Sequence, residues 1–362
     1  MKSIFFVGDI LIERIPDLKW DVIQKVFHEA DAVICNFEGV LKGDHKPVSK
    51  AGPVIFQHPE SIDILHTIGV TAATTCNNHT YDFGLEALRN TEESLEASNI
   101  KVFGSELPKN QVFAVDSLSR NVTIIPACES HPVTIAGSSI IPLPDYMRLF
   151  SSELLKRISK AKENRDWVVV TVHAGLELVD IPLSNIRKRY KDLVKAGADM
   201  VVGHHPHVPQ GFEEYMGKPI FYSLGNFVFQ RENMTNPNIN GIALRVEFDD
   251  EKFSYETYSV EKDENSSEVS LRYDNFDHLK NLLENDSHYQ LMLEKAKSIH
   301  GEIFESSAPL FGSKSLKGWF KLTINLLIRP LWLMKRRKLI TDLIKRNESY
   351  IGLKQALDER EV

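Results

Sequence analysis

The stretch Met200-Val201-Val202-Gly203-His204-His205-Pro206-His207 joins a short apolar run to three histidines within four residues. The apolar part is typical of a buried strand. Three imidazoles directly after a buried strand need partners unless water solvates them, because burying an unpaired polar group costs free energy. A polar surface turn is the alternative interpretation. We predict that this run is a metal-binding loop at the end of a strand.

Other apolar runs, before and after this stretch in the sequence, are also followed by polar side chains. Asp9 follows Ile4–Val7, Asn36 and Glu38 follow Ala32–Cys35, Asn77-Asn78-His79 follows Val70–Cys76, His173 follows Trp167–Val172, and Asn226 follows Ile220–Leu224. In open α/β sheets, ligands bind outside the carboxyl ends of the strands. Carboxylates, amides and imidazoles are the donors that hold Mn²⁺, Fe or Zn²⁺ in hydrolytic sites. Singly, a turn at Asp9 or Asn226 and a core histidine at 173 are ordinary alternatives, but together these residues predict a metal site.

Alternation of strands and helices indicates the fold class. Between the apolar runs lie amphipathic segments, one opening at Pro59 and closing at Gly69, another from about Ser184 to Gly197. This pattern predicts an α/β protein with a largely parallel core. The runs Ile242–Phe248 and Phe253–Val260 alternate instead, which predicts an antiparallel hairpin.

Composition is that of an ordinary globular protein, with 42% hydrophobic and 26% charged residues in 362. The formal net charge of −7 argues against a nucleic-acid partner. No run reaches the roughly 18 apolar residues of a spanning helix, and the first apolar run is too short for a signal peptide. We expect a cytoplasmic protein in which the three cysteines are buried free thiols.

The motifs together resemble the CapA family of capsule and poly-γ-glutamate synthesis proteins, within the calcineurin-like metallophosphoesterase superfamily. The matching pieces are Gly8-Asp9, Asn36-Phe37-Glu38-Gly39, Asn77-Asn78-His79 with Asp82 and Gly84, His173–Glu177, Ala196–Asp199, Gly203–Val208 and Tyr222–Phe227. They stand in matching order over about residues 1–235. The resemblance implies a four-layer α-β-β-α sandwich, metallophosphoesterase-like, with two divalent metal ions (Mn, Fe or Zn) at the strand ends.

The resemblance also implies roles for individual residues. The metal ligands would be Asp9, Glu38, Asn78, His173, His205 and His207, with Glu38 or Asp9 bridging the ions. His79 would be the general acid, and His204 would support the ligands. The superfamily's first motif has a histidine where this chain has Leu11, and its second has aspartates where Asn36 and Glu38 stand. A site that holds one ion, or loads weakly, therefore stays open.

The function that follows is a metal-dependent hydrolase, a phosphoesterase of capsule or cell-surface polymer biosynthesis. Its nucleophile would be a metal-activated hydroxide, and His79 would protonate the leaving oxygen. Asp82 either orients His79 as a second catalytic residue or caps the following helix. The substrate would be an anionic small molecule or polymer. The alternatives are a non-catalytic metal-binding scaffold of a membrane-associated polymer synthesis complex and a metal-dependent amide hydrolase.

Near residue 262 the composition changes, so we predict a main domain over residues 1–262 and a C-terminal helical extension over 263–362. Within it, residues 311–346 hold ten Lys or Arg and one acid, Asp342, with apolar residues interleaved. Such a segment is typical of a helix lying on an anionic membrane surface. This predicts a peripheral position on the inner face of the membrane. Packing against the acidic remainder of the chain is the competing interpretation.

Overall fold

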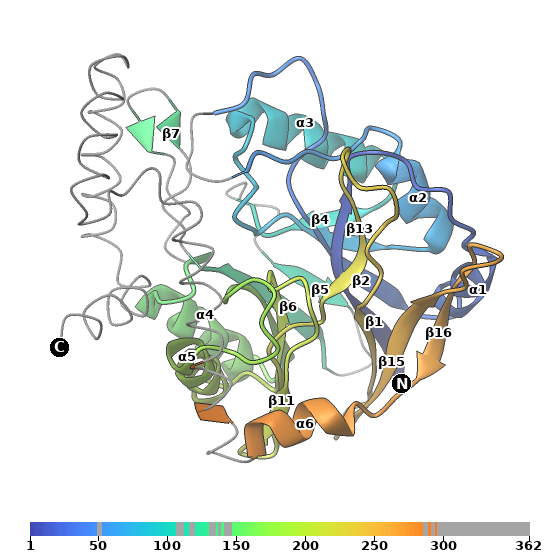
Figure 1. Cartoon of the computed structure of the whole chain (residues 1–362). Coiled ribbons are helices and arrows are strands. Elements are labelled where there is room, and N and C mark those ends of the chain that lie inside the picture. The colour runs from blue at the N-terminus through green and yellow to red at the C-terminus, as the bar shows by residue number, and fades with distance from the viewer. Residues whose placement is uncertain are drawn as a thin grey trace, which may run out of the picture. The chain divides into compact units, whose positions relative to one another are not determined.

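The computed structural model describes residues 1–48, 53–105, 112–115, 120–129, 135–136, 139–140, 147–284, 289–290 and 294. The chain divides into a compact unit over Met1–Asn285 and a second over Asp286–Val362. The first unit contains two large sheets flanked by helices (Figure 1). The predicted membrane segment over 311–346 lies outside the described residues.

The first sheet is mixed, with parallel strands at its centre. Its order is β16-β15-β14-β1-β2-β3-β4, and β13 pairs with β1 as well. The strands are β1 (Lys2–Ile12), β2 (Ala32–Phe37), β3 (Ala72–Thr74), β4 (Lys101–Phe103), β13 (Asn226–Gln230), β14 (Ile242–Phe248), β15 (Phe253–Lys262) and β16 (Val269–Tyr273). Strands β1 to β4 are parallel, and β14–β15 is the predicted antiparallel hairpin.

The second sheet has the order β11-β12-β10-β9-β6-β5. Its strands are β5 (Phe113–Val115), β6 (Val122–Cys128), β9 (Trp167–His173), β10 (Met200–His204), β11 (Phe212–Tyr215) and β12 (Lys218–Phe221), and β7 (Ile135–Ala136) pairs separately with β8 (Ser139–Ile140). The four central strands β6, β9, β10 and β12 are parallel and fully or largely buried. Their continuous apolar runs are those of strands covered on both faces.

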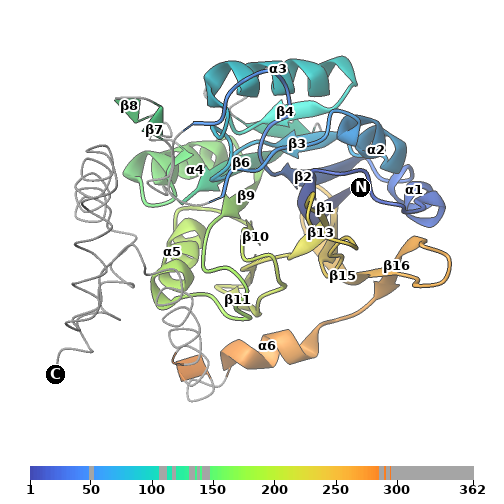
Figure 2. The ribbon, with the colours of Figure 1, turned by 45° about the horizontal axis from the view of Figure 1, so that its top comes forward.

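Helices cover the outer faces of the two sheets, which gives four layers (Figure 2). The helices are α1 (Asp21–Phe27), α2 (Ser61–Ile68), α3 (Gly84–Ala97), α4 (Ser152–Glu163), α5 (Ser184–Lys195) and α6 (Asp277–Glu284). Helices α1 to α3 lie over the first sheet, whereas α4 and α5 lie over the second. One apolar core fills the space between the first sheet and its helices, and another fills the space between the sheets. The predicted α-β-β-α sandwich is confirmed.

Strand β1 changes the side of the sheet that its residues face. Before the bulge, the odd-numbered residues Phe5 and Val7 pack against the helices. After it, the even-numbered residues Ile10 and Ile12 do so. A register shift in the pairing of β1 with both parallel neighbours accounts for this, because one extra residue reverses the alternation. The bulge turns Asp9 toward the second sheet. The strand therefore continues five residues past the run Ile4–Val7 seen in the sequence.

The bulge requires a glycine. A Cβ on Gly8 would lie 2.1 Å from the carbonyl oxygen of Gly225, which accepts a hydrogen bond from the Asp9 amide. The backbone of β1 thereby approaches the turn before β13 more closely than any side chain permits.

The C-terminal end of the sandwich extends beyond the boundary predicted at residue 262. Strand β16 pairs with β15 along Val269–Tyr273, a stretch that the sequence pattern predicts to be helical. The division into a domain over 1–262 and an extension stays a prediction. Among the described residues no helix is long and apolar enough to cross a membrane, and Cys35, Cys76 and Cys128 are buried free thiols as expected.

Candidate metal centre

Both sheets contribute polar residues to one place in the molecule. In the first sheet Asp9 pairs in register with Asn36 on one side and with Asn226 on the other. In the second sheet His173 pairs with His204 at the carboxyl ends of β9 and β10. All five side chains are at least 95% buried. The strand ends predicted from the sequence thus converge between the sheets.

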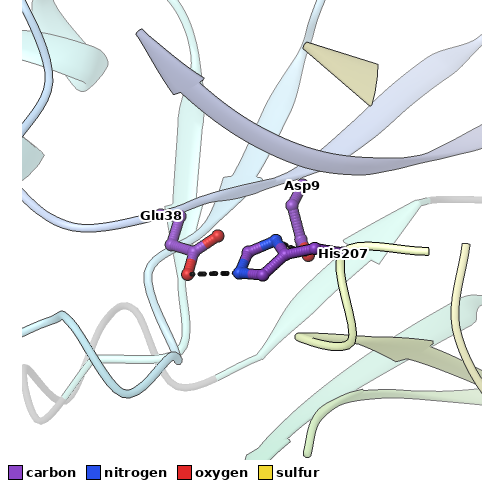
Figure 3. Close-up of side chains that lie close together, drawn as sticks. All are labelled: Asp9, Glu38 and His207. Carbon is purple, nitrogen blue, oxygen red and sulfur yellow. Dashed lines mark ion pairs between the residues drawn. The ribbon is translucent and has the colours of Figure 1, made fainter. Parts of the chain in front are cut away.

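Asp9, Glu38 and His207 form a first group of potential ligands (Figure 3). One ligand atom of each lies within 4.8 Å of the others. His207 Nδ1 is 3.4 Å from Asp9 Oδ2, and His207 Nε2 is 3.7 Å from Glu38 Oε1. The imidazole lies between the two carboxylates, so this group combines two anionic donors and one neutral donor.

Asn78, His173 and His205 form a second group. His173 Nε2 is 2.8 Å from Asn78 Oδ1 and 3.1 Å from His205 Nδ1. The rings of His173 and His205 meet edge to face, with their centroids 4.8 Å apart. All six predicted ligands are therefore present at the centre, but they divide into one charged group and one uncharged group.

Asn36 lies against both groups, and His204 lies against the first. Asn36 Nδ2 donates a hydrogen bond to Asp9 Oδ1 over 2.8 Å, and the same nitrogen lies 3.4 Å from His173 Nδ1. His204 Nδ1 lies 3.3 Å from Asp9 Oδ1. Asn36 thus contacts one member of each ligand group, while His204 contacts Asp9, and its supporting role stays a prediction.

The backbone of the histidine loop is strained at two ligands. His205 has a backbone φ of +98° and His207 one of +59°, values that residues other than glycine seldom adopt. The loop is held from outside by Leu178, whose amide donates to the Pro206 carbonyl over 2.8 Å. It is held from inside by Asp9 Oδ2, which accepts from the His205 amide over 3.1 Å. Such strain persists where surrounding contacts fix it, and it concentrates at functional sites.

Burial and opposite charges act differently on the two acids. Burial raises the pKa of Asp9, but the hydrogen bond and charge of His204 and the charge of His207 outweigh it, so the net pKa is lowered. For Glu38, burial raises the pKa to about 8, with a further increase from Asp9. The surroundings of Asp9 therefore favour its charged form, whereas burial favours the neutral form of Glu38.

The surroundings also shift the pKa values of His173 and His207, in opposite directions. Burial lowers the pKa of His173 well below its usual value, and the neighbouring histidines lower it further. His173 is thus neutral and able to donate a lone pair. Burial also lowers the pKa of His207, but the charges of Glu38 and Asp9 reverse the effect and raise it overall.

His79 lies at the edge of the first group. Its Nε2 is 3.9 Å from Glu38 Oε1, and its Nδ1 is 2.7 Å from Asp82 Oδ2. Asp82 Oδ2 also accepts from the Ile55 amide over 2.9 Å. Helix α3 begins at Gly84 without a side-chain cap from its N-cap residue, Phe83. Of the two interpretations of Asp82, the geometry favours orientation of His79.

Two buried amides that are not among the predicted ligands hold the centre together, and the sequence did not point to one of them, Gln57. Gln57 donates to the carbonyls of Ile10 and Glu38 and accepts from the Ile12 amide, which joins the Glu38 loop to β1. Asn77 Nδ2 donates to Asn36 Oδ1 and to the Phe37 carbonyl. Asn77 stands in a motif that the sequence singled out, but Gln57 lies in a loop with no distinguishing pattern.

The donor set fits a divalent cation. Neither oxygen of the buried Glu38 carboxylate accepts a hydrogen bond from any residue that the structure describes. A buried carboxylate whose oxygens accept no hydrogen bond is costly, and a cation between Glu38, Asp9 and His207 would reduce that cost. Leu11, in contrast, is fully buried in β1 and adds no donor.

Comparison with known proteins gives a consistent result. The family model described as "Bacterial capsule synthesis protein PGA_cap" matches residues 3–231. The chain is 30% identical over 252 residues to the PGA biosynthesis protein CapA of Bacillus subtilis, covering 63% of each chain. It is 31% identical over 242 residues to the capsule biosynthesis protein CapA of Bacillus anthracis, covering 62% of this chain and 59% of that protein.

These matches span less than two thirds of either curated relative. Among solved structures, one described as a novel phosphatase from Mycoplasma pneumoniae aligns with 80% of this chain and 98% of its own. Its TM-score is 0.45 and its sequence identity is 15%.

Proposed function

The chain belongs to the PGA_cap family of bacterial capsule synthesis proteins, and on that premise we propose that it is a metal-dependent hydrolase, a phosphoesterase, in the synthesis of a capsule or polyglutamate-type polymer. Its substrate would be an anionic small molecule or polymer. Two divalent ions, Mn, Fe or Zn, would be its cofactors. The observation that carries this proposal is the buried Glu38 carboxylate, which has no hydrogen-bond donor among the described residues and faces Asp9 and His207.

When bound, a divalent ion would supply the Lewis acidity that activates water and neutralises negative charge on the substrate. Asp9, Glu38 and His207 would hold one ion, and Asn78, His173 and His205 the other. Asn36 and His204 keep Asp9 in position through its Oδ1.

His79 would act as the general acid of the reaction. Its Nδ1 is engaged by Asp82, so its Nε2 is the nitrogen that faces the first ligand group. The Asp82 carboxylate fixes the ring orientation and stabilises the cationic imidazole, which can donate a proton to a leaving oxygen. Burial of both side chains excludes water that would otherwise weaken this contact.

The experiment measures metal content and hydrolysis in the same preparation. Purified protein is analysed for bound metals and then assayed on phosphomonoesters and phosphodiesters with Mn²⁺, alongside His205→Ala and His79→Ala. We expect His205→Ala to lose metal and activity, and His79→Ala to keep metal but lose activity. If the protein retains no metal, or if neither substitution changes the activity, the proposal is contradicted.

A non-catalytic scaffold is the second candidate, and the burial of Leu11 at a position where the superfamily has a ligand favours it. A scaffold would bind metal through the same residues, but it would hydrolyse neither phosphoesters nor γ-glutamyl amides at any metal concentration. Amide hydrolysis without phosphoester hydrolysis would identify the third candidate, an amide hydrolase.

We also propose that the basic segment 311–346 brings the protein to an anionic membrane surface. Its ten cationic residues are interspersed with apolar ones that can enter the headgroup region. Sedimentation with vesicles tests this, using full-length protein and a variant with Lys335, Arg336, Arg337 and Lys338 changed to glutamine. We expect the wild type to bind anionic vesicles more strongly than zwitterionic ones. Equal partitioning of the two proteins would remove the membrane proposal.

A further inference from the structure

The two ligand groups differ in the charge they offer a cation. Asp9 and Glu38 give the first group two carboxylates, whereas Asn78, His173 and His205 give the second group none. The affinity of protein sites for hard divalent cations rises with the number of anionic oxygen ligands. A carboxylate shared between the groups would reduce the difference.

Asp9 is poorly placed to be that shared carboxylate. An ionised carboxylate offers about four lone-pair positions. Asn36 Nδ2 takes one on Oδ1, the His205 amide takes one on Oδ2, and His204 Nδ1 lies 3.3 Å from Oδ1. The lone-pair position that remains on Asp9 Oδ2 faces His207, which belongs to the first group.

Asn36 occupies the place between the groups without supplying charge. Its Nδ2 is in contact with Asp9 Oδ1 of the first group and approaches His173 Nδ1 of the second, while its Oδ1 accepts from Asn77. An amide here is a donor toward both ligands, so it cannot offset the charge of a second cation. An aspartate in the same position would provide one more carboxylate to both groups.

We propose that the centre binds two divalent ions with unequal affinity, the first at Asp9, Glu38 and His207 and the second at Asn78, His173 and His205, and that Asn36 sets the difference. The inference rests on the proposed metal centre but not on hydrolysis. It assigns Asn36 as a positioning residue that determines how many ions the centre holds at a given metal concentration.

Calorimetric titration of the chelator-treated, full-length protein with Mn²⁺ tests the inequality, and electron paramagnetic resonance reports when two Mn²⁺ ions become coupled. We expect two resolved binding steps in the wild type, with the coupled signal appearing only during the second. Asn36→Asp should tighten the second step at least about ten-fold, because it adds an anionic ligand. Two ions bound in one step of equal affinity by the wild type would overturn the inference without recourse to any variant.

Asn226→Asp is the matched control. Asn226 is buried, pairs in register with Asp9 on the side opposite Asn36, and lies 3.0 Å from His207, so it adds the same charge beside the first group only. We expect the second step to change less than about three-fold in this variant, because its added charge lies away from the second group. An equal gain in both variants, or no gain in Asn36→Asp, would refute the role of Asn36. Unequal binding without hydrolysis would defeat the proposed function and leave this inference standing.

Discussion

Asp82 Oδ2 lies 2.7 Å from Nδ1 of His79, and both side chains are buried beside the candidate metal ligands. The distance is that of a hydrogen bond between a carboxylate and an imidazole that carries a proton on Nδ1. The same carboxylate oxygen is fixed by the Ile55 amide. The orientation of His79 is thus imposed by two segments of the chain that come together only in the fold.

The first prediction concerns this pair. His79→Ala should reduce kcat by about 10²- to 10⁴-fold on an alkyl phosphoester, because the leaving alkoxide then receives no proton. The loss should be much smaller on a 4-nitrophenyl ester, whose leaving group needs no protonation. Asp82→Asn should show the same selectivity with a smaller loss, since the amide can still accept from Ile55 but not stabilise the imidazolium. Equal losses on both esters, or loss of bound metal, would indicate a structural role instead.

The second prediction is a pH dependence of the stability of metal-free protein. Burial raises the pKa of Glu38 to about 8, above its ordinary value of 4.5. The folded state then holds a proton that the unfolded state releases, so the contribution of Glu38 to stability falls as the pH rises from about 4.5 to about 8. Glu38→Gln should flatten this part of the curve of Tm against pH, and saturating Mn²⁺ should do the same in the wild type. Parallel curves for wild type and variant would contradict it.

The third prediction concerns the bulge that places Asp9. Gly8→Ala should destabilise the fold by about 3 kcal/mol, because its Cβ would lie 2.1 Å from a backbone oxygen that accepts a hydrogen bond from the Asp9 amide. Gly43→Ala is the control, since among the described residues only the His45 ring lies within 4 Å of a Cβ there, at 3.9 Å. Urea denaturation of both variants gives the comparison. Similar midpoints for the two would mean that β1 and the Gly225 turn separate easily.

The sequence predicted most of the parallel strands, the hairpin and the candidate ligands, because buried parallel strands are continuous apolar runs and their ends carry polar donors. It did not predict the partition of ligands into a charged and an uncharged group. That partition depends on which side chains face each other across two sheets, which no local pattern encodes. Strands β4 and β5 have three residues each, too few for a recognisable period. The bulge is visible in the sequence, because the apolar residues that face the helices change from odd-numbered (Phe5, Val7) to even-numbered (Ile10, Ile12) positions.

The fourth prediction lies away from the metal centre, where α5 meets the second sheet. Arg187 donates two hydrogen bonds to Glu213, of 2.8 and 2.9 Å, and Tyr222 donates a third of 2.7 Å. Burial raises the pKa of Glu213, but these bonds and one from Lys191 outweigh it, so the net pKa is lowered from 4.5. The stability that Glu213 contributes is therefore complete above about pH 4.5 and is lost as the pH falls through its folded-state pKa.

Glu213→Gln should accordingly cost about 1 to 3 kcal/mol at pH 7, as expected for hydrogen bonds to a charged group. The difference from wild type should shrink as the pH falls below 4.5, because the wild-type carboxyl is then protonated as well. Glu86→Gln is the control, since its pair with Arg89 is exposed on α3 and contributes little. Denaturant unfolding at pH 7 and pH 3.5 measures both variants. A cost for Glu213→Gln that is the same at the two pH values would show that the charge of Glu213 does not stabilise this contact, and that its shape alone does.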